Sequence, residues 1–303
     1  MPKPKQIARA RTQYTDYVVR EPMELMDFLA ARMPDASRTK LKSLLSKRIV
    51  YVDNVITTQF NFSLKPGMKV QISRNRGNHE FHHNLLSIVY EDAYLIVVEK
   101  KEGLLSVNTD RQKERTAVTI LNEYVRRQGG HNSRVYIVHR LDRDTSGLMM
   151  FAKDEQTQNT LRDHWHEIVF DRRYVAVVSG EMEREAGTVH SWLTDRKLYV
   201  SSSPTDDGGK ESVTHYRTIK RANGLSLVEL HLDTGRKNQI RVHMQDLGHP
   251  IIGDGRYGFE EINPLGRLAL HAFKLCFDHP VTGEEMRFET PYPGEFKKLF
   301  LKK

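Results

Sequence analysis

In the last three quarters of the chain, short apolar runs typical of strands outnumber segments whose apolar residues have helical spacing. The two kinds of segment do not alternate regularly. Apolar runs typical of strands occur at 86–90, 94–98, 135–138, 148–152, 174–178, 188–193, 212–219, 226–232 and 267–277. Helical spacing of apolar residues predicts helices near 117–127, 156–166, 237–247 and 293–301. Because a parallel doubly wound sheet needs a helix after nearly every strand, this order favours an α+β fold.

The excess positive charge of the chain lies in its first quarter. The 303 residues have a net charge of +8; residues 1–80 contain 15 Lys or Arg and 7 Asp or Glu, and the rest contain 32 of each. This asymmetry is typical of a polyanion-binding module ahead of a neutral domain, with a merely solubilising basic tail as the alternative. We therefore expect a basic flexible arm at 1–17, a small domain at 18–75, a linker at 76–85 and a second domain at 86–303.

Two helices and short strands are predicted in the small domain. A helix over 22–33 places Leu25, Phe28 and Leu29 on one face, and a second helix runs from Ser37, a good N-cap, to about residue 48. Strands are expected at 49–52 and 68–72. The second helix carries the cations that we expect to contact the polyanion: Arg38, Lys40, Lys42, Lys47 and Arg48.

A charged loop at 139–147 joins two apolar segments in the second domain. It reads His139-Arg140-Leu141-Asp142-Arg143-Asp144-Thr145-Ser146-Gly147. An aspartate flanked by arginines stays ionised at neutral pH, as a nucleophile or a base must. The residues alone leave three interpretations open, namely a catalytic carboxylate, a two-carboxylate glycosidase pair of Asp142 and Asp144, and a charged turn without a catalytic role.

The stretch 138–148 resembles the signature of the RluA-type pseudouridine synthases. Two later segments resemble the family in the same order: Arg173-Tyr174-Val175-Ala176-Val177-Val178-Ser179-Gly180 and Thr234-Gly235-Arg236-Lys237-Asn238-Gln239-Ile240-Arg241-Val242-His243, which continues to Asp254. The resemblance covers residues 86–300. It implies the pseudouridine synthase fold, with a mixed, largely antiparallel sheet and a central RNA-binding cleft. It also implies isomerisation of uridine to pseudouridine in RNA, without a cofactor or a metal.

The resemblance assigns roles to four residues. Asp142 matches the catalytic aspartate, and Arg241 matches the basic residue that pairs with it. Tyr174 matches the tyrosine that lies against the target base. Arg140 matches the residue that fills the place of the uridine in the RNA stack after base flipping. Asn238 departs from the family, since many members have His there.

Residues 18–75 resemble the small, helix-rich α/β RNA-binding domain named after ribosomal protein S-four, on three runs of residues at 37–41, 50–54 and 64–70. Within the family, this arrangement is similar to enzymes that act on large-subunit ribosomal RNA, so 23S rRNA is the favoured substrate. Transfer RNA is the alternative substrate. A non-catalytic RNA-binding or ribosome-assembly factor and a glycosidic hydrolase are the alternative functions.

The remaining sequence features predict an intracellular protein without a nucleotide cofactor. The single cysteine, Cys276, lies in an apolar stretch and is expected to be a core residue of a protein in a reducing compartment. No secretory signal or membrane span is recognisable, so a cytoplasmic monomer is expected. The segment 253–258 fits a G-x-G-x-x-G pattern, but Pro264 follows, and a turn is expected instead of a dinucleotide site.

Overall fold

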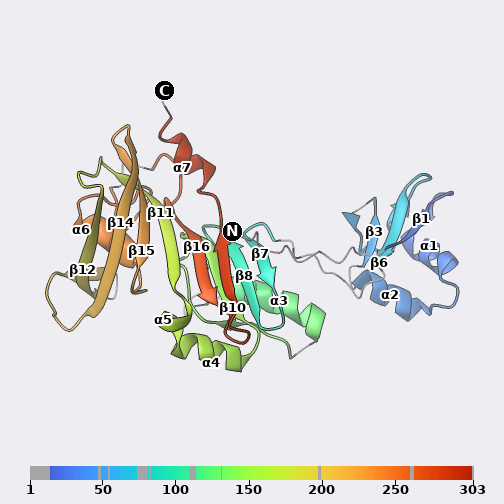
Figure 1. Cartoon of the computed structure of the whole chain (residues 1–303). Helices are drawn as coiled ribbons and strands as arrows, with labels where there is room; N and C mark the ends of the chain where they lie inside the picture. Colours follow the sequence, from blue (N-terminus) through green and yellow to red (C-terminus); the bar gives the residue numbers. More distant parts are fainter. Residues whose placement is uncertain are drawn as a thin grey trace. The chain divides into compact units, whose positions relative to one another are not determined.

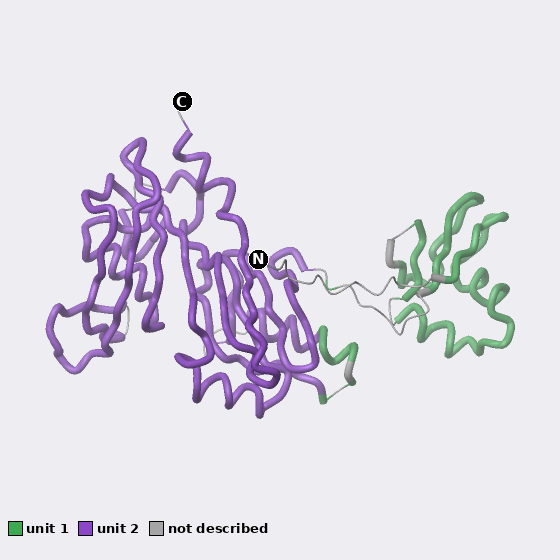
Figure 2. Tube along the Cα trace, in the orientation of Figure 1, with its two compact units in different colours: residues 1–81, 124–132 green, residues 82–123, 133–303 purple. Residues whose placement is uncertain are grey.

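The chain divides into two compact units (Figure 2), which comprise residues 1–81 with 124–132 and residues 82–123 with 133–303. The computed structural model describes residues 14–46, 49–53, 55–73, 81, 83–108, 114–130, 132–196, 199–259 and 263–301. The division at residue 81 falls inside the segment 76–85 that was predicted to be a linker, most of which lies outside the described residues. The assignment of 124–132 to the first unit was not predicted.

The small unit packs two helices against antiparallel strands. Its helices are α1 (Leu25–Arg32) and α2 (Arg38–Ser46). A four-stranded sheet has the order β1-β6-β3-β4, and β2 pairs with β5. The strands are β1 (Tyr14–Val18), β2 (Met23–Glu24), β3 (Val50–Val52), β4 (Val55–Ile56), β5 (Ser63–Leu64) and β6 (Lys69–Ser73). All pairings are antiparallel, so this unit also has an α+β arrangement.

The core of the small unit follows from the apolar spacing of its helices. Leu25 and Leu29 of α1 and Leu41 and Leu45 of α2 are buried together with Val70 of the sheet. The Oγ of Ser37 accepts a hydrogen bond from the backbone N–H of Lys40 at 3.2 Å, as a helix-capping residue does.

Residues 14–17 do not belong to an arm, contrary to the prediction of an arm over 1–17. Residues 14–17 belong to β1, which pairs with β6 from Tyr14 opposite Ser73 to Val18 opposite Lys69. Asp16 fixes this pairing, because its carboxylate lies 2.7 Å from the Nζ of Lys69. The prediction was wrong here because so short and polar a strand is specified by its distant partner. Residues 1–13 lie outside the described residues.

The large unit contains one mixed sheet of 11 strands (Figure 1). Its order is β13-β12-β14-β15-β11-β16-β10-β8-β7, with β17 paired to β16 and β9 paired to β10. Among the named strands of the described residues, β10 and β16 are the one parallel pair, which confirms the α+β class with a largely antiparallel sheet. The strands are β7 (Leu86–Glu91), β8 (Leu95–Lys100), β9 (Tyr136–Ile137), β10 (Ser146–Ala152), β11 (Asp171–Ser179), β12 (Ala186–Asp195), β13 (Val200–Ser203), β14 (Lys210–Ala222), β15 (Leu225–Leu232), β16 (Leu270–Asp278) and β17 (Glu285–Glu289).

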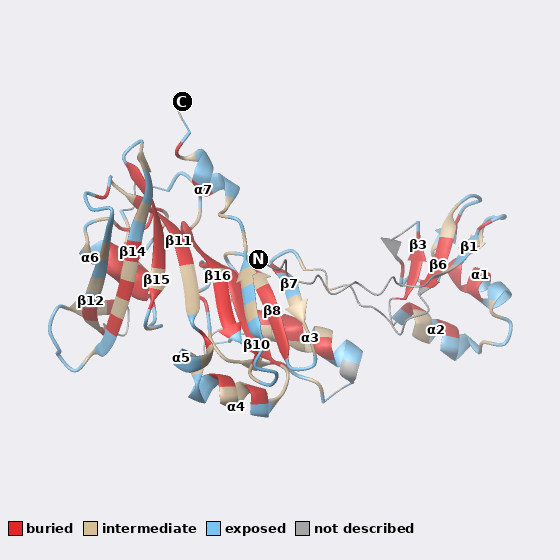
Figure 3. Ribbon diagram, in the orientation of Figure 1, coloured by how far each residue is buried: buried red, intermediate tan, exposed pale blue. Residues whose placement is uncertain are grey.

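Burial is continuous along the central strands of this sheet (Figure 3). Every residue of β10 is buried, and so are most residues of β8, β11 and β16. Such strands are covered on both faces, whereas the peripheral β17 alternates between exposed and partly buried residues. Because β10 and β11 are held this rigidly, the loop before β10 and the side chains at the start of β11 have fixed positions.

Five helices complete the large unit and the segment shared with the small one. They are α3 (Ala117–Gly129), α4 (Glu155–Asp163), α5 (Trp165–Ile168), α6 (Gln239–Asp246) and α7 (Gly294–Lys298). The helix predicted over 156–166 is two helices, α4 and α5, with His164 at the junction. The strands β13 and β17 were not predicted. Among the described residues, no helix is long and apolar enough to cross a membrane.

Candidate active site

The loop at 139–147 leads into the fully buried strand β10, and two side chains from earlier in the chain, Lys100 at the end of β8 and Ser106 after it, hold the loop. The Oγ of Ser106 donates to the carbonyl of Leu141 at 2.7 Å and accepts from its N–H at 3.2 Å. The buried Lys100 donates from its Nζ to the carbonyls of Arg143, Leu104 and Lys101. Bonds on both sides of residue 142 fix the backbone from which the Asp142 side chain projects.

Lys100 is an unusual anchor because it is completely buried at the end of β8. Burial lowers the pKa of its ammonium to about 8, although Asp144 and Asp142 act in the opposite direction. The Lys100 ammonium, which releases its proton more readily than an exposed lysine does, therefore lies against the backbone of the loop. The sequence analysis did not single it out, since a lysine at a strand end is usually exposed.

Gly147 allows the loop to approach β16. Its φ is +118°, and a Cβ at this position would lie 2.2 Å from the carbonyl oxygen of Ala272. Gly147 and Ala272 are partners in the parallel pairing of β10 with β16. Only glycine fits this backbone conformation and this distance.

One pocket collects the residues that the sequence singled out. Arg140, Asp142, Tyr174 and Arg241 all line it, although 101 positions separate the first from the last. The remaining lining residues are Leu141, Thr145, Leu232, Arg236, Asn238, Gln239, Ile240 and Leu270. The structure thus brings the three sequence segments of the resemblance to one place.

Arg241, on α6, binds two carboxylates unequally. Its Nη1 lies 3.8 Å from the carboxylate of Asp142. Its Nε and Nη2 donate to the two oxygens of Asp254, each at 2.7 Å. The expected partner of Arg241 is therefore within ion-pair distance, but its bidentate partner is Asp254.

Asp254 is the residue that the sequence analysis missed. Its side chain is completely buried, and its Oδ1 also accepts the backbone N–H groups of Arg256 and Tyr257 at 3.0 Å. Burial alone would raise the pKa of Asp254, but the hydrogen bonds and the charge of Arg241 lower it overall. The only signal in the sequence was that Asp254 ends the segment resembling the family. Residues 252–258 form turns, as expected for the G-x-G-x-x-G pattern.

Asn238 also contributes to holding Arg241. It has a left-handed φ of 54° immediately before α6, and its Oδ1 accepts from Nη1 of Arg241 at 3.1 Å. Its Nδ2 donates to the hydroxyl of Tyr257 at 3.2 Å, and the ring of Tyr257 lies 5.1 Å from the guanidinium. Asn tolerates the left-handed region better than most residues, so this departure from the family fits the local backbone.

Tyr174 is buried near the start of β11 and lines the same pocket. Burial raises the pKa of its phenol, the nearby Arg172 partly opposes this, and Asp142 adds to it. The hydroxyl is therefore protonated at neutral pH and can donate or accept a hydrogen bond while the ring offers a stacking face.

Three guanidinium groups besides that of Arg241 lie at or near the pocket. Arg140 and Arg236 line it, and Arg172 lies beside Gly235 and over the ring of Trp165. Neither Arg140 nor Arg172 forms an ion pair with another residue that the structure describes. The exposed guanidiniums of Arg140 and Arg236 beside a partly buried carboxylate suit a polyanionic substrate.

Of the five cations expected to bind RNA in the small unit, three lie on α2. Arg38, Lys40 and Lys42 are exposed. Lys47 and Arg48 lie outside the described residues. No role for any of the five follows from their placement alone.

Among the described residues, the side chains close enough together to share a metal ion are those of His215, His231 and Asp233. The Nε2 of His215 already lies 2.8 Å from Asp233. None of the three lines the pocket around Asp142.

Comparisons with known proteins identify the family of this chain. The family model described as RNA pseudouridylate synthase matches residues 94–246. A Bacillus subtilis protein described as the uncharacterized RNA pseudouridine synthase YlyB is 35% identical over 278 residues, covering 90% of this chain and 91% of the relative. The ribosomal large subunit pseudouridine synthase D of Zymomonas mobilis is 33% identical over 291 residues, covering 90% and 91%. A solved structure of human RNA pseudouridylate synthase domain containing 4 shares the fold, with a TM-score of 0.57 and 23% identity over 69% of this chain and 90% of that chain. The chain belongs to the RluA-type RNA pseudouridine synthase family.

Proposed function

We propose that this protein isomerises specific uridines of large-subunit ribosomal RNA, with Asp142 as the catalytic carboxylate. The observation that carries the proposal is the convergence of Asp142, Tyr174 and Arg241 on one pocket from three distant segments. The carboxylate is 26% exposed and lies 3.8 Å from a fixed guanidinium. It is therefore accessible to a substrate and remains next to a positive charge.

The reaction exchanges one bond to the ribose for another. The bond between ribose C1′ and uracil N1 breaks, the base turns, and a bond forms between C1′ and C5. The proton at C5 is then lost and N1 gains one, so the atoms balance without a redox partner. Asp142 can start this sequence either by attacking C1′ or by removing the proton at C2′. Uridine deuterated at C2′ distinguishes the two, because only the second route gives a primary isotope effect.

Tyr174 and Arg140 supply the remaining tasks. The buried ring of Tyr174 holds the base against the pocket, and its protonated hydroxyl can exchange a proton with the turning base. A base inside an RNA stack must first leave it, which costs a few kcal/mol. The planar guanidinium of Arg140, exposed at the mouth of the pocket, is suited to take the place of the base.

The substrate proposal rests on two supports. Relatives at 30–33% identity carry the name ribosomal large subunit pseudouridine synthase D. The small unit resembles the S-four RNA-binding domain in sequence, and Arg38, Lys40 and Lys42 are exposed along α2. Three such cations can contact phosphates without reading the base sequence.

The catalytic assignment is tested by replacing Asp142 with Asn and Asp144 with Asn. Release of tritium from uridine labelled at C5 measures the reaction. We expect Asp142→Asn to bind RNA and to lose all detectable release, whereas Asp144→Asn, on the same loop and exposed, retains it. Full activity of Asp142→Asn contradicts the mechanism, and free uracil as a product indicates a hydrolase. A wild-type protein that binds RNA but never releases tritium is a non-catalytic factor.

The small unit is tested with a variant in which Arg38, Lys40 and Lys42 are all replaced by Gln. If each contacts one phosphate, the salt dependence of binding falls by about 0.7 per lost contact. Lys65→Gln, an exposed lysine of the same unit, is the control. Mapping of pseudouridine in RNA from cells with and without the gene identifies the substrate, and changes confined to transfer RNA contradict the ribosomal assignment.

A further inference from the structure

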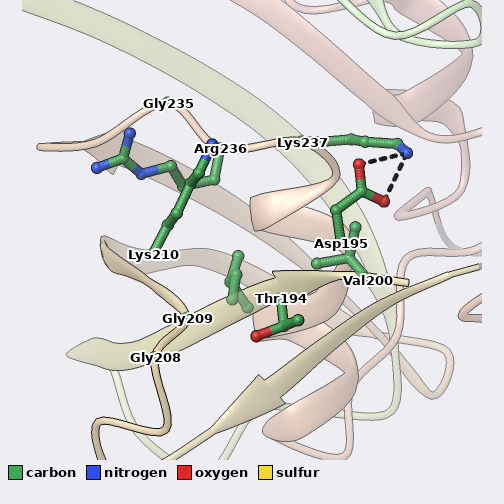
Figure 4. A pocket seen from close by; sticks show the side chains of 10 residues that line it. Thr194, Asp195, Val200, Gly208, Gly209, Lys210, Gly235, Arg236 and Lys237 are labelled. Carbon is green, nitrogen blue, oxygen red and sulfur yellow. Dashed lines mark hydrogen bonds and ion pairs between the residues drawn. The ribbon is translucent and has the colours of Figure 1, made fainter. Parts of the chain in front are cut away.

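A second cavity, of about 300 Å³, opens beside the site described above (Figure 4). It lies over one end of β12, β13 and β14, where Leu193 pairs with Lys210 and Asp195 pairs with Val200. The segment 235–237, which leads into α6, forms another wall. The full lining is Leu193, Thr194, Asp195, Val200, Gly208, Gly209, Lys210, Gly235, Arg236 and Lys237.

The charged groups of this cavity leave an excess of positive charge. Three cations, Lys210, Arg236 and Lys237, face one carboxylate, Asp195. Lys237 is neutralised, because its Nζ lies 2.8 and 2.9 Å from the two oxygens of Asp195. Lys210 forms no ion pair with another described residue. The Nε of Arg236 donates a hydrogen bond to the backbone carbonyl of Glu211, which carries no charge. The lining cations without an ion-pair partner among the described residues are therefore Lys210 and Arg236. The exposed carboxylates of Asp206 and Asp207 lie next to the lining, where they accept the N–H groups of Gly208 and Gly209.

The backbone and the floor of the cavity suit a chain that lies against it. Of the three lining glycines, Gly208 has open space where a Cβ would lie, so a ligand can approach the main chain there. Leu193 and Val200 form an apolar floor and pack with Tyr257 in one buried cluster. Lys210 and Arg236 are both exposed at the rim, which leaves the cavity open at its edge.

Arg236 connects this cavity to the isomerisation pocket, because it lines both. We propose that the second cavity binds a phosphodiester of the substrate RNA strand next to the target uridine. The inference rests on the proposed function, since it gives the strand a second anchor when the uridine occupies the first pocket. Lys210 and Arg236 hold the phosphate, and the apolar floor lies under the neighbouring sugar.

The test compares Lys210→Gln with Lys220→Gln. Both lysines are exposed and lie on β14, but only Lys210 lines the cavity. We expect Lys210→Gln to raise the Kd and the KM for RNA up to about fivefold, as for the loss of one partly exposed ion pair. It should reduce the salt slope of binding by about 0.7, with an unchanged single-turnover rate at saturating RNA. Lys220→Gln should match the wild type.

RNA length gives an independent readout. Substrates are shortened from the 5′ or the 3′ side of the target uridine, and Kd is measured for both variants. The difference between Lys210→Gln and the wild type should vanish once the strand no longer reaches the cavity. The same penalty at every length, or strong competition by millimolar inorganic phosphate that is independent of RNA length, overturns the proposal. Because Kd and the salt slope need no turnover, a protein without isomerase activity contradicts the proposed function and still tests this cavity.

Discussion

Replacement of Asp254 by Asn tests whether Arg241 is held by a buried ion pair. The Asp254 side chain is fully buried and that of Arg241 is 14% exposed. The carboxylate accepts two hydrogen bonds from the guanidinium at 2.7 Å and two from backbone N–H groups at 3.0 Å. An Asn side chain keeps one acceptor oxygen and turns an NH₂ group toward a donor. The guanidinium then stays buried without a bidentate partner.

The expected cost is near the lower end of the range for breaking a buried ion pair, about 3 kcal/mol. For a unit of this size that corresponds to a fall in melting temperature of roughly 6–12 °C. Asp195→Asn is the matched control, because it removes the same charge from an ion pair whose side chains are 57% and 53% exposed. Its cost should stay below about 1 kcal/mol.

Chemical denaturation of the single variants and of the Arg241→Gln, Asp254→Asn double variant provides the assay. The double variant should be less destabilised than the sum of the two single variants, because each single variant leaves a polar group unpaired. The lowered pKa of Asp254 means that its stabilisation is present above its unfolded pKa of about 3.9 and is lost as pH falls through the folded value. The difference between wild type and Asp254→Asn should therefore shrink below about pH 4. Additive costs, or a penalty no larger than that of Asp195→Asn, refute the reasoning.

Two other predictions concern the backbone around the catalytic loop. Gly147→Ala should lower the free energy of unfolding by more than about 3 kcal/mol, because its Cβ would overlap the Ala272 carbonyl. The control is Gly283→Ala, which has a φ of +69° and open space around the added Cβ, and it should lower the free energy of unfolding by about 1–2 kcal/mol. Thermal denaturation of both variants measures the two costs. Burial lowers the pKa of Lys100 to about 8, so the unfolded chain binds more protons between about pH 8 and 10 and wild-type stability should rise across that window. Lys100→Met should lack this rise in urea titrations; an identical rise in the variant assigns it to other groups.

Local patterns were enough to predict most elements of the fold. The helices α1, α2, α3 and α6 follow from the spacing of apolar residues and the glycines or caps at their ends. The strands β8, β10 and β11 follow from continuous apolar runs. The strand β1 was missed because its stability comes from pairing with β6, more than 50 residues away.

The loop at 139–147 could be recognised in the sequence as a candidate site, because so many charged groups lie beside an apolar strand. The residues alone did not choose among a catalytic carboxylate, a glycosidase pair and a plain turn. The resemblance made that choice, and it also pointed to Tyr174 and Arg241. The resemblance did not indicate that Arg241 binds Asp254 more closely than Asp142.

Only the tertiary structure decided which partner holds each group. Asp254 reaches Arg241 through the turn after β-bridge residue Ile251, and Lys100 reaches the loop carbonyls from the end of β8. The cavity with Lys210 and Arg236 exists because β12, β13, β14 and the segment before α6 meet at one end of the sheet. A hydrogen bond or an ion pair depends on distances of a few ångströms, and the sequence order of residues dozens of positions apart does not specify such distances. The sequence therefore determined the chemistry available to this protein, and the packing of its sheet determined which charges face one another.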